Sequence, residues 1–231
     1  MTARPAAALP GVWGLTTAVP ASAGAAVAVS GAGSPARPDD AALRERVRAA
    51  LSAVWGEDPG PLGLARRCPA CGSGEHGAPR LTGLPAGRRV LVSLSGVADD
   101  DGAPLRVAAW WTPGPAPAPP GSGLGLDLER IDAPALAAPD GLGGVGFSTA
   151  ERTWLAGLAP ADRPAARARL WTRKEALVKA AGTGFTGDPA DVPALSPGPG
   201  DAVVDLGQEL LRAAGLPPAV RGALALRVPT R

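Results

Sequence analysis

Two lysines are conspicuous in this sequence because the chain otherwise uses arginine for positive charge. Lysine and arginine together number 23, yet only Lys174 and Lys179 are lysines, and both lie in the stretch WTRKEALVK. An ordinary surface ion pair would tolerate arginine. A compact ammonium that approaches a phosphate oxygen as a point charge is harder to replace. The two lysines therefore favour contact between this segment and a specific anion.

The spacing within the same stretch places an acid beside one of the lysines. Glu175 lies four residues before Lys179, so a helix would carry both side chains on one face. Lys174 falls nearer to the apolar stripe of that helix, which consists of Leu170, Leu177 and Ala181. A surface ion pair worth about a few tenths of a kcal/mol is the alternative interpretation. The selective use of lysine weighs against it.

A second acidic pair occurs in the stretch GLGLDLE, residues 123–129. Side chains alternate along a strand, so Asp127 and Glu129 point together, away from Leu126 and Leu128. Two carboxylates on one face repel each other unless a positive charge lies between them. A half-exposed strand with a polar face is the alternative, and the GxG pattern is only weak support for a nucleotide site. Together with Glu175 and the lysines, the pair indicates a Mg²⁺–diphosphate site.

Cap and turn residues predict the elements that position these groups. The helix carrying Glu175 should run over about 164–181 and end at Gly182. Ahead of it, Ser148 and Glu151 have the spacing of a capping box.

Upstream, the pattern predicts another helix and a strand pair. The helix begins at Pro38 and has its apolar positions at Leu43, Val47, Leu51 and Val54. The strands are RRVLVSLSG and PLRVAAWW, joined by an acidic turn. Residues 10–30 are expected to form a hairpin, 57–88 are rich in turns, and the tail adds a short helix and a closing strand.

Composition bounds the class of protein. The 231 residues carry a formal net charge of +2 with 19% charged residues, which does not suggest a nucleic-acid or membrane partner. No apolar run reaches about 18 residues, and the start lacks a clear signal-peptide core, so we expect a cytoplasmic protein. A Pro/Gly linker, 112–123, divides the chain into halves 1–111 and 124–231. The expected fold class is α/β (α+β).

Both acidic motifs together resemble a known family. GLGLDLE, 45 intervening residues and WTRKEALVK are similar to the two-part signature of the surfactin-type 4′-phosphopantetheinyl transferases, and FSTAER resembles the lead-in to the second part. The resemblance covers residues 66–185 well, the tail loosely and the first 60 residues poorly. It implies a pseudo-twofold protein of two similar halves, with coenzyme A and Mg²⁺ in the cleft between them.

The resemblance also implies roles for the acidic and basic residues. Asp127, Glu129 and Glu175 would ligate Mg²⁺, and Glu175 would act as the base for a serine of an acyl or peptidyl carrier protein. Lys179 would meet the diphosphate of the co-substrate coenzyme A, and Lys174 would add positive charge nearby. One chain holding both halves makes a monomer sufficient.

Two upstream segments, EHGAPRL and VSLSG, resemble weaker family segments that line the coenzyme A site. They imply contacts from His76, Gly77, Arg80 and Ser95. Two departures concern this side of the site: no histidine stands between Ser95 and Gly96, and Ala78 replaces a basic residue. Candidates for the missing phosphate contact are Arg80, Arg88 and Arg89, with Arg44, Arg46 and Arg48 placed less convincingly.

Three alternatives stay open at this point. Cys68, Cys71 and His76 could bind zinc but are one ligand short of a tetrahedral site, so a plain loop is preferred. A degenerate family member that binds coenzyme A or a carrier protein without catalysis is the second reading of the whole chain. A structural domain with an incidental motif match is the third.

Overall fold

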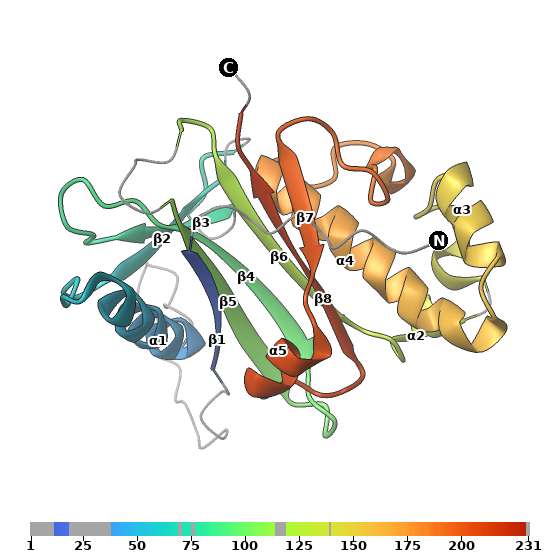
Figure 1. Cartoon of the computed structure of the whole chain (residues 1–231), viewed down its shortest axis with the longest axis horizontal. Helices are drawn as coiled ribbons and strands as arrows, with labels where there is room; N and C mark the ends of the chain where they lie inside the picture. The colour runs from blue at the N-terminus through green and yellow to red at the C-terminus, as the bar shows by residue number, and fades with distance from the viewer. Residues whose placement is uncertain are drawn as a thin grey trace.

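The computed structural model describes residues 12–18, 38–68, 71–74, 77–113, 119–138 and 140–229. Within these ranges the chain forms two antiparallel sheets with helices on either side, which confirms the expected α+β class (Figure 1). One sheet comes from the N-terminal half and the other from the C-terminal half.

The first sheet has five strands in the order β1-β5-β4-β3-β2. Their bounds are β1 Val12–Ala18, β2 Gly63–Arg67, β3 Ala78–Thr82, β4 Leu91–Ala98 and β5 Pro104–Thr112. Helix α1, Pro38–Trp55, packs on this sheet through Leu43, Val47 and Leu51, as predicted. Val54 is 41% exposed, so its predicted place in the stripe is wrong; the half-buried Trp55 packs there instead.

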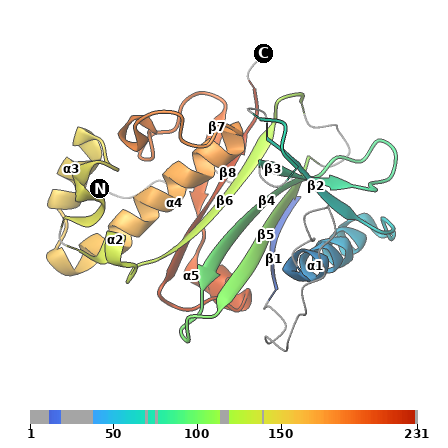
Figure 2. The same ribbon diagram turned by 180° about the vertical axis from the view of Figure 1, so that it is seen from behind.

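The second sheet has three strands in the order β6-β8-β7. Their bounds are β6 Gly123–Arg130, β7 Asp201–Asp205 and β8 Val220–Arg227. The long helix α4, Arg163–Ala181, covers one face, as Figure 2 shows, and α5, Gln208–Ala213, packs on the other. The short helices are α2 Pro134–Ala137, η1 Gly141–Gly144, α3 Thr149–Ala156, η2 Pro160–Asp162 and η3 Pro189–Asp191.

The two sheets meet where β4 lies beside β6 (Figure 1). Serine hydroxyls join them: the backbone N–H of Leu126 donates to Ser93 Oγ at 2.9 Å, and that of Leu128 donates to Ser95 Oγ at 3.2 Å. Apolar side chains from both sheets, among them Val107, form one shared core with Leu126 and Leu128. The halves are therefore packed firmly against each other along the strand that carries the acidic motif.

Most of the predicted elements are present. The strand pair β4–β5, the tail helix and the closing strand are confirmed, and Gly182 ends α4 in the left-handed conformation at φ 74°. Ser148 and Glu151 form the expected capping box at α3. Strands β2 and β3 lie in the region read only as turns, because five-residue strands rich in Arg, Pro and Gly have weak strand signals. Of the hairpin expected at 10–30, β1 is a strand paired with β5, and the rest lies outside the described residues.

Candidate active site

Two glycines of the acidic motif allow helix α4 to lie directly on strand β6. A Cβ added to Gly123 would overlap the carbonyl oxygen of Ala180, and one added to Gly125 would overlap that of Ala176. The GxG pattern is thus explained by close approach of two backbones and not by nucleotide binding. The following residues on the same face of β6, Asp127 and Glu129, are brought to α4 by this contact.

Asp127 and Lys179 form the centre of the site. Lys179 Nζ donates to Asp127 Oδ1 at 2.6 Å and to the carbonyl oxygen of Leu126 at 3.1 Å. Ser95 Oγ lies 3.3 Å from the same carboxylate oxygen. The other oxygen, Asp127 Oδ2, is buried and has no hydrogen-bond partner. The site therefore holds a carboxylate with one satisfied oxygen and one that is open to a further cation or donor.

Burial raises the pKa of Asp127 to about 7. Lys179 opposes this shift as an ion-pair partner, while the negative charges of Glu175 and Glu129 add to it. The pKa of Glu129 is also raised, first by burial and then by Glu175. All three acids thus interact electrostatically, as the sequence predicted for a shared face.

The carboxylates are not gathered into a closed cage. Among the described residues, no three His, Cys, Asp or Glu side chains form a group that could hold a metal ion. The fit to a cation rests on chemistry that is present: oxygen donors of the kind Mg²⁺ prefers and the unpartnered buried oxygen of Asp127. Glu129 and Glu175, both half-buried, have side chains that solvent still reaches.

A cavity of about 540 Å³ opens beside this cluster, between β3, the start of β4, the start of β6 and the end of α4. Four cationic side chains line it: Arg80, Arg88, Arg89 and Lys179. None of the described residues that line it is acidic. A second cavity of about 370 Å³ shares Lys179, Ala78 and Gly182 with the first and adds Cys68, Gly77 and Thr183 to its lining. Lys179 therefore borders both cavities, and its positive charge favours an anionic ligand there.

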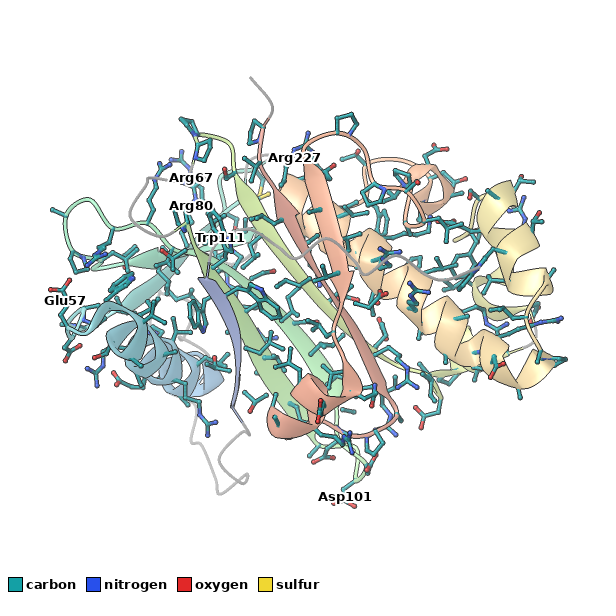
Figure 3. The ribbon with its side chains drawn as sticks, viewed as in Figure 1. Glu57, Arg67, Arg80, Asp101, Trp111 and Arg227 are labelled. Atoms are coloured by element: carbon teal, nitrogen blue, oxygen red, sulfur yellow. The ribbon has the colours of Figure 1, made fainter. Side chains whose placement is uncertain are left out.

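The arginines of the larger cavity differ in how free they are. Arg88 donates to Glu57 Oε1 at 2.9 Å and stacks over the Trp55 ring at 4.8 Å. Arg80 is exposed, and its guanidinium forms no ion pair within the described ranges. Figure 3 shows Arg80 close to Arg67, at the same end of the molecule. Arg80 is thus the least committed cation of the cavity.

Helix α1 does not contribute to either cavity, so its three arginines are poorly placed for the phosphate contact considered for them. Arg48 is occupied by Glu45 at 2.9 Å and by Asp58 Oδ2 at 2.6 Å.

Two residues expected to contact coenzyme A have partners inside the protein. Lys174 is completely buried, pairs with Glu151 and lines neither cavity, because the helix turns it toward α3 and the segment after α4. Ser95 lies within β4 and bonds to Leu128 and Asp127 across the junction of the sheets. Neither is retained as a ligand. The sequence signal for Lys174 was its place near the apolar stripe, and that for Glu151 was its capping position.

The segment between β2 and β3 is only partly described. Gly77 adopts φ 99° and lines the smaller cavity, where a Cβ would collide with the backbone at Arg67 and Cys68. Cys68 is half-buried and Cys71 is exposed. His76 lies outside the described residues, so its contact with coenzyme A and the zinc alternative stay predictions.

Comparison with known proteins agrees with this site. Residues 123–211 match the family model described as the 4′-phosphopantetheinyl transferase superfamily. The match begins at β6, ends in α5 and includes all three acids and both lysines. It supports the predicted superfamily and a transferase of this kind. No curated protein matches the chain. Within the described ranges, no helix is long and apolar enough to span a membrane.

Proposed function

We propose that this protein transfers the 4′-phosphopantetheine arm of coenzyme A to a serine of an acyl or peptidyl carrier protein, as a surfactin-type enzyme that depends on Mg²⁺. The observation that carries the proposal is the Asp127–Lys179 pair: its lysine lines a cation-rich cavity, and its acid is close enough to Glu175 for that charge to raise the pKa of Asp127. The family match covers the same residues. A cytoplasmic, monomeric protein is part of the proposal.

The reaction exchanges the phosphoanhydride bond of the coenzyme A diphosphate for a phosphate ester to serine. The oxygen of the carrier serine attacks the phosphorus that bears the pantetheine arm, the bond from that phosphorus to the bridging diphosphate oxygen breaks, and adenosine 3′,5′-bisphosphate leaves. The serine proton goes to a base, and negative charge grows on the leaving oxygen. Mg²⁺, when bound by the oxygens of Asp127, Glu129 and Glu175, supplies charge neutralisation for the diphosphate.

The residues of the chain have separate tasks in this reaction. Glu175 is half-buried at the cluster and accepts the serine proton, directly or through a water. Lys179 borders both cavities and stabilises charge on the diphosphate. Arg80, with no ion pair within the described ranges, binds the terminal phosphate of coenzyme A in place of the histidine that the family has after Ser95. Gly77 lines the path of the bound arm.

The proposal is tested by incubating the protein with coenzyme A, Mg²⁺ and a panel of apo carrier proteins, then measuring the intact mass of each carrier. We expect a carrier to gain the mass of the arm, with loss of the gain when Mg²⁺ is chelated. A wild-type protein that binds coenzyme A but modifies no carrier would support the alternative of a non-catalytic binding protein.

A further inference from the structure

Lys174 and Glu151 form the most deeply buried ion pair in the described parts of the chain. Their side chains are 0% and 2% exposed, and Lys174 Nζ lies 2.8 Å from Glu151 Oε2. The same ammonium donates to the carbonyl oxygens of Pro189 at 2.9 Å and Val192 at 2.6 Å. The ammonium therefore has two hydrogen-bond acceptors and one ion-pair partner inside the protein.

Both carboxylate oxygens of Glu151 also have hydrogen-bond partners. Its Oε2 accepts from the backbone N–H of Ser148 at 2.8 Å, and its Oε1 accepts from that of Ala194 at 3.3 Å. The pair therefore ties together three pieces of backbone: the start of α3, the middle of α4 and the segment 189–194.

The segment fixed by this pair begins at the candidate site. Gly182, Thr183 and Gly184, directly after α4, line the smaller cavity, and the chain then continues to the carbonyl groups held by Lys174. Lys174 is also the residue directly before Glu175 on α4. The cavity wall at 182–184 and the acid at 175 are thus both anchored by one internal contact.

We propose that the Lys174–Glu151 pair is a positioning device for the transferase: it holds segment 182–194 against α4 so that the cavity wall is formed before coenzyme A binds. The inference rests on the proposed function, since the wall matters only if this cavity takes the substrate. Lys174 does not contact the substrate and acts through the backbone that it holds.

The geometry also explains the choice of lysine. Three acceptors converge on one point with no solvent access, which a compact ammonium can satisfy and a planar guanidinium with five donors cannot. Lys174→Arg is therefore expected to fail as a substitute.

The deciding variant is Glu151→Leu combined with Lys174→Met. Removing both partners together leaves no uncompensated buried charge, so the double variant is milder than either single substitution. The backbone groups of Ser148, Ala194, Pro189 and Val192 lose their partners, which is the loss of positioning to be measured. The control is Arg169→Met, which removes the exposed pair that α4 forms with Asp205 at 2.8 Å. Hydrogen–deuterium exchange of ligand-free protein reports on segment 182–194, and isothermal titration with coenzyme A, without a carrier protein, reports on the cavity.

We expect the double variant to fold, to exchange about tenfold faster in segment 182–194 and to bind coenzyme A about tenfold more weakly, with the control unchanged. In the transfer assay, KM for coenzyme A should rise by a similar factor while kcat changes less than about threefold. A folded double variant with wild-type exchange and affinity would overturn the inference. A wild-type protein without transferase activity would count against the proposed function, whereas exchange and affinity still decide whether the pair positions the wall.

Discussion

The two lysine sites of α4 lie five residues apart and differ in almost every physical respect except the length of the ion pair. Lys179 bonds to Asp127 at 2.6 Å, keeps 33% of its side chain exposed and borders both cavities. Lys174 bonds to Glu151 at 2.8 Å and has no exposure at all. The chain therefore uses lysine at these two positions for different reasons: Lys179 lies at an open site, and Lys174 lies at a sealed one.

The difference lies in how completely each pair is satisfied. Lys174 donates to two carbonyl oxygens and pairs with Glu151, and both oxygens of Glu151 have hydrogen-bond partners inside the protein. At the open site, Asp127 Oδ2 has no partner, and its carboxyl has a raised pKa. A satisfied buried pair rigidifies the fold, while an incompletely satisfied one beside a cavity has capacity for a ligand. The comparison thus assigns a role in the reaction to Lys179 and a role in positioning the backbone to Lys174.

The largest effect is expected from the acids of the open site. Asp127→Ala and Glu175→Gln should each reduce kcat/KM at least about a hundredfold, since each removes a group that neutralises or moves charge in the reaction. Asp127→Ala should also weaken the dependence on Mg²⁺ while the fold survives. Steady-state kinetics and circular dichroism check this, with Asp132→Ala, which removes only an exposed partner of Arg130, as the control. Full activity of the Asp127→Ala variant would show that the acidic cluster is not part of the active site.

Lys179 should matter more for activity, whereas Lys174 should matter more for the free energy of unfolding. Lys174→Ala leaves Glu151 buried without its counter-charge and should lower the free energy of unfolding by about 3–5 kcal/mol. Lys179→Ala also leaves Asp127 buried without its counter-charge, but Lys179 is 33% exposed and Asp127, with its pKa raised to about 7, can take up a proton, so the loss should be smaller, about 1 kcal/mol. Urea denaturation followed by tryptophan fluorescence measures both values. Equal losses in the two variants would contradict the distinction between a sealed and an open pair.

The raised pKa of Asp127 predicts a pH dependence of stability in metal-free buffer. Its ordinary value is 3.8 and its value in the fold is about 7, so between these limits the folded state keeps a proton that the unfolded state has lost. The free energy of unfolding therefore falls as pH rises from about 4 to about 7, by at most about 1.4 kcal/mol per pH unit from this group. Asp127→Asn lacks the titrating group, and its melting curve should not show this part of the fall.

Melting temperatures of wild type and Asp127→Asn in chelator, from pH 4.5 to 8, give the difference directly. Asp205→Asn, which alters a half-exposed carboxylate paired with Arg169, serves as the matched amide control. Parallel curves for wild type and Asp127→Asn would show that the Asp127 carboxyl is already ionised at low pH.

The smallest effect is expected at the rim of the open site. Arg80→Ala should raise KM for coenzyme A about tenfold and leave kcat nearly unchanged, because a charged hydrogen bond to a phosphate contributes about 1.5–3 kcal/mol. Arg67 lies at the same end of the molecule but lines neither cavity, so Arg67→Ala is the matched control (Figure 3). Equal effects of the two substitutions would indicate general attraction of an anion instead of a specific contact.

Local patterns predicted the parts of this molecule that depend on local physics. The bounds of α4, its stop at Gly182 and the capping box at Ser148 follow from short-range rules, and all three are confirmed. The alternation in GLGLDLE correctly separated Asp127 and Glu129 from the buried leucines, because a strand has only two faces.

Sequence patterns could not predict the contacts that depend on which distant segment packs against a residue. Lys174 lies near the apolar stripe of its helix, and only tertiary packing decides that Glu151 and the carbonyl groups of Pro189 and Val192 surround it. Ser95 looked like part of a ligand-binding segment, yet its hydroxyl bonds to Leu128, a residue 33 positions away, where the sheets meet. Strands β2 and β3 were missed because pairing, and not composition, makes them strands.

The most direct test of the central distinction is the rate of a single turnover with coenzyme A at saturating concentration, measured for Lys179→Ala and for the double variant Glu151→Leu/Lys174→Met. Saturation removes differences in substrate affinity, so the rate reports on the chemical step alone. The account predicts a rate at least about a hundredfold below wild type for Lys179→Ala and within about threefold of wild type for the double variant. A double variant as slow as Lys179→Ala, or a Lys179→Ala protein at the wild-type rate, would contradict it.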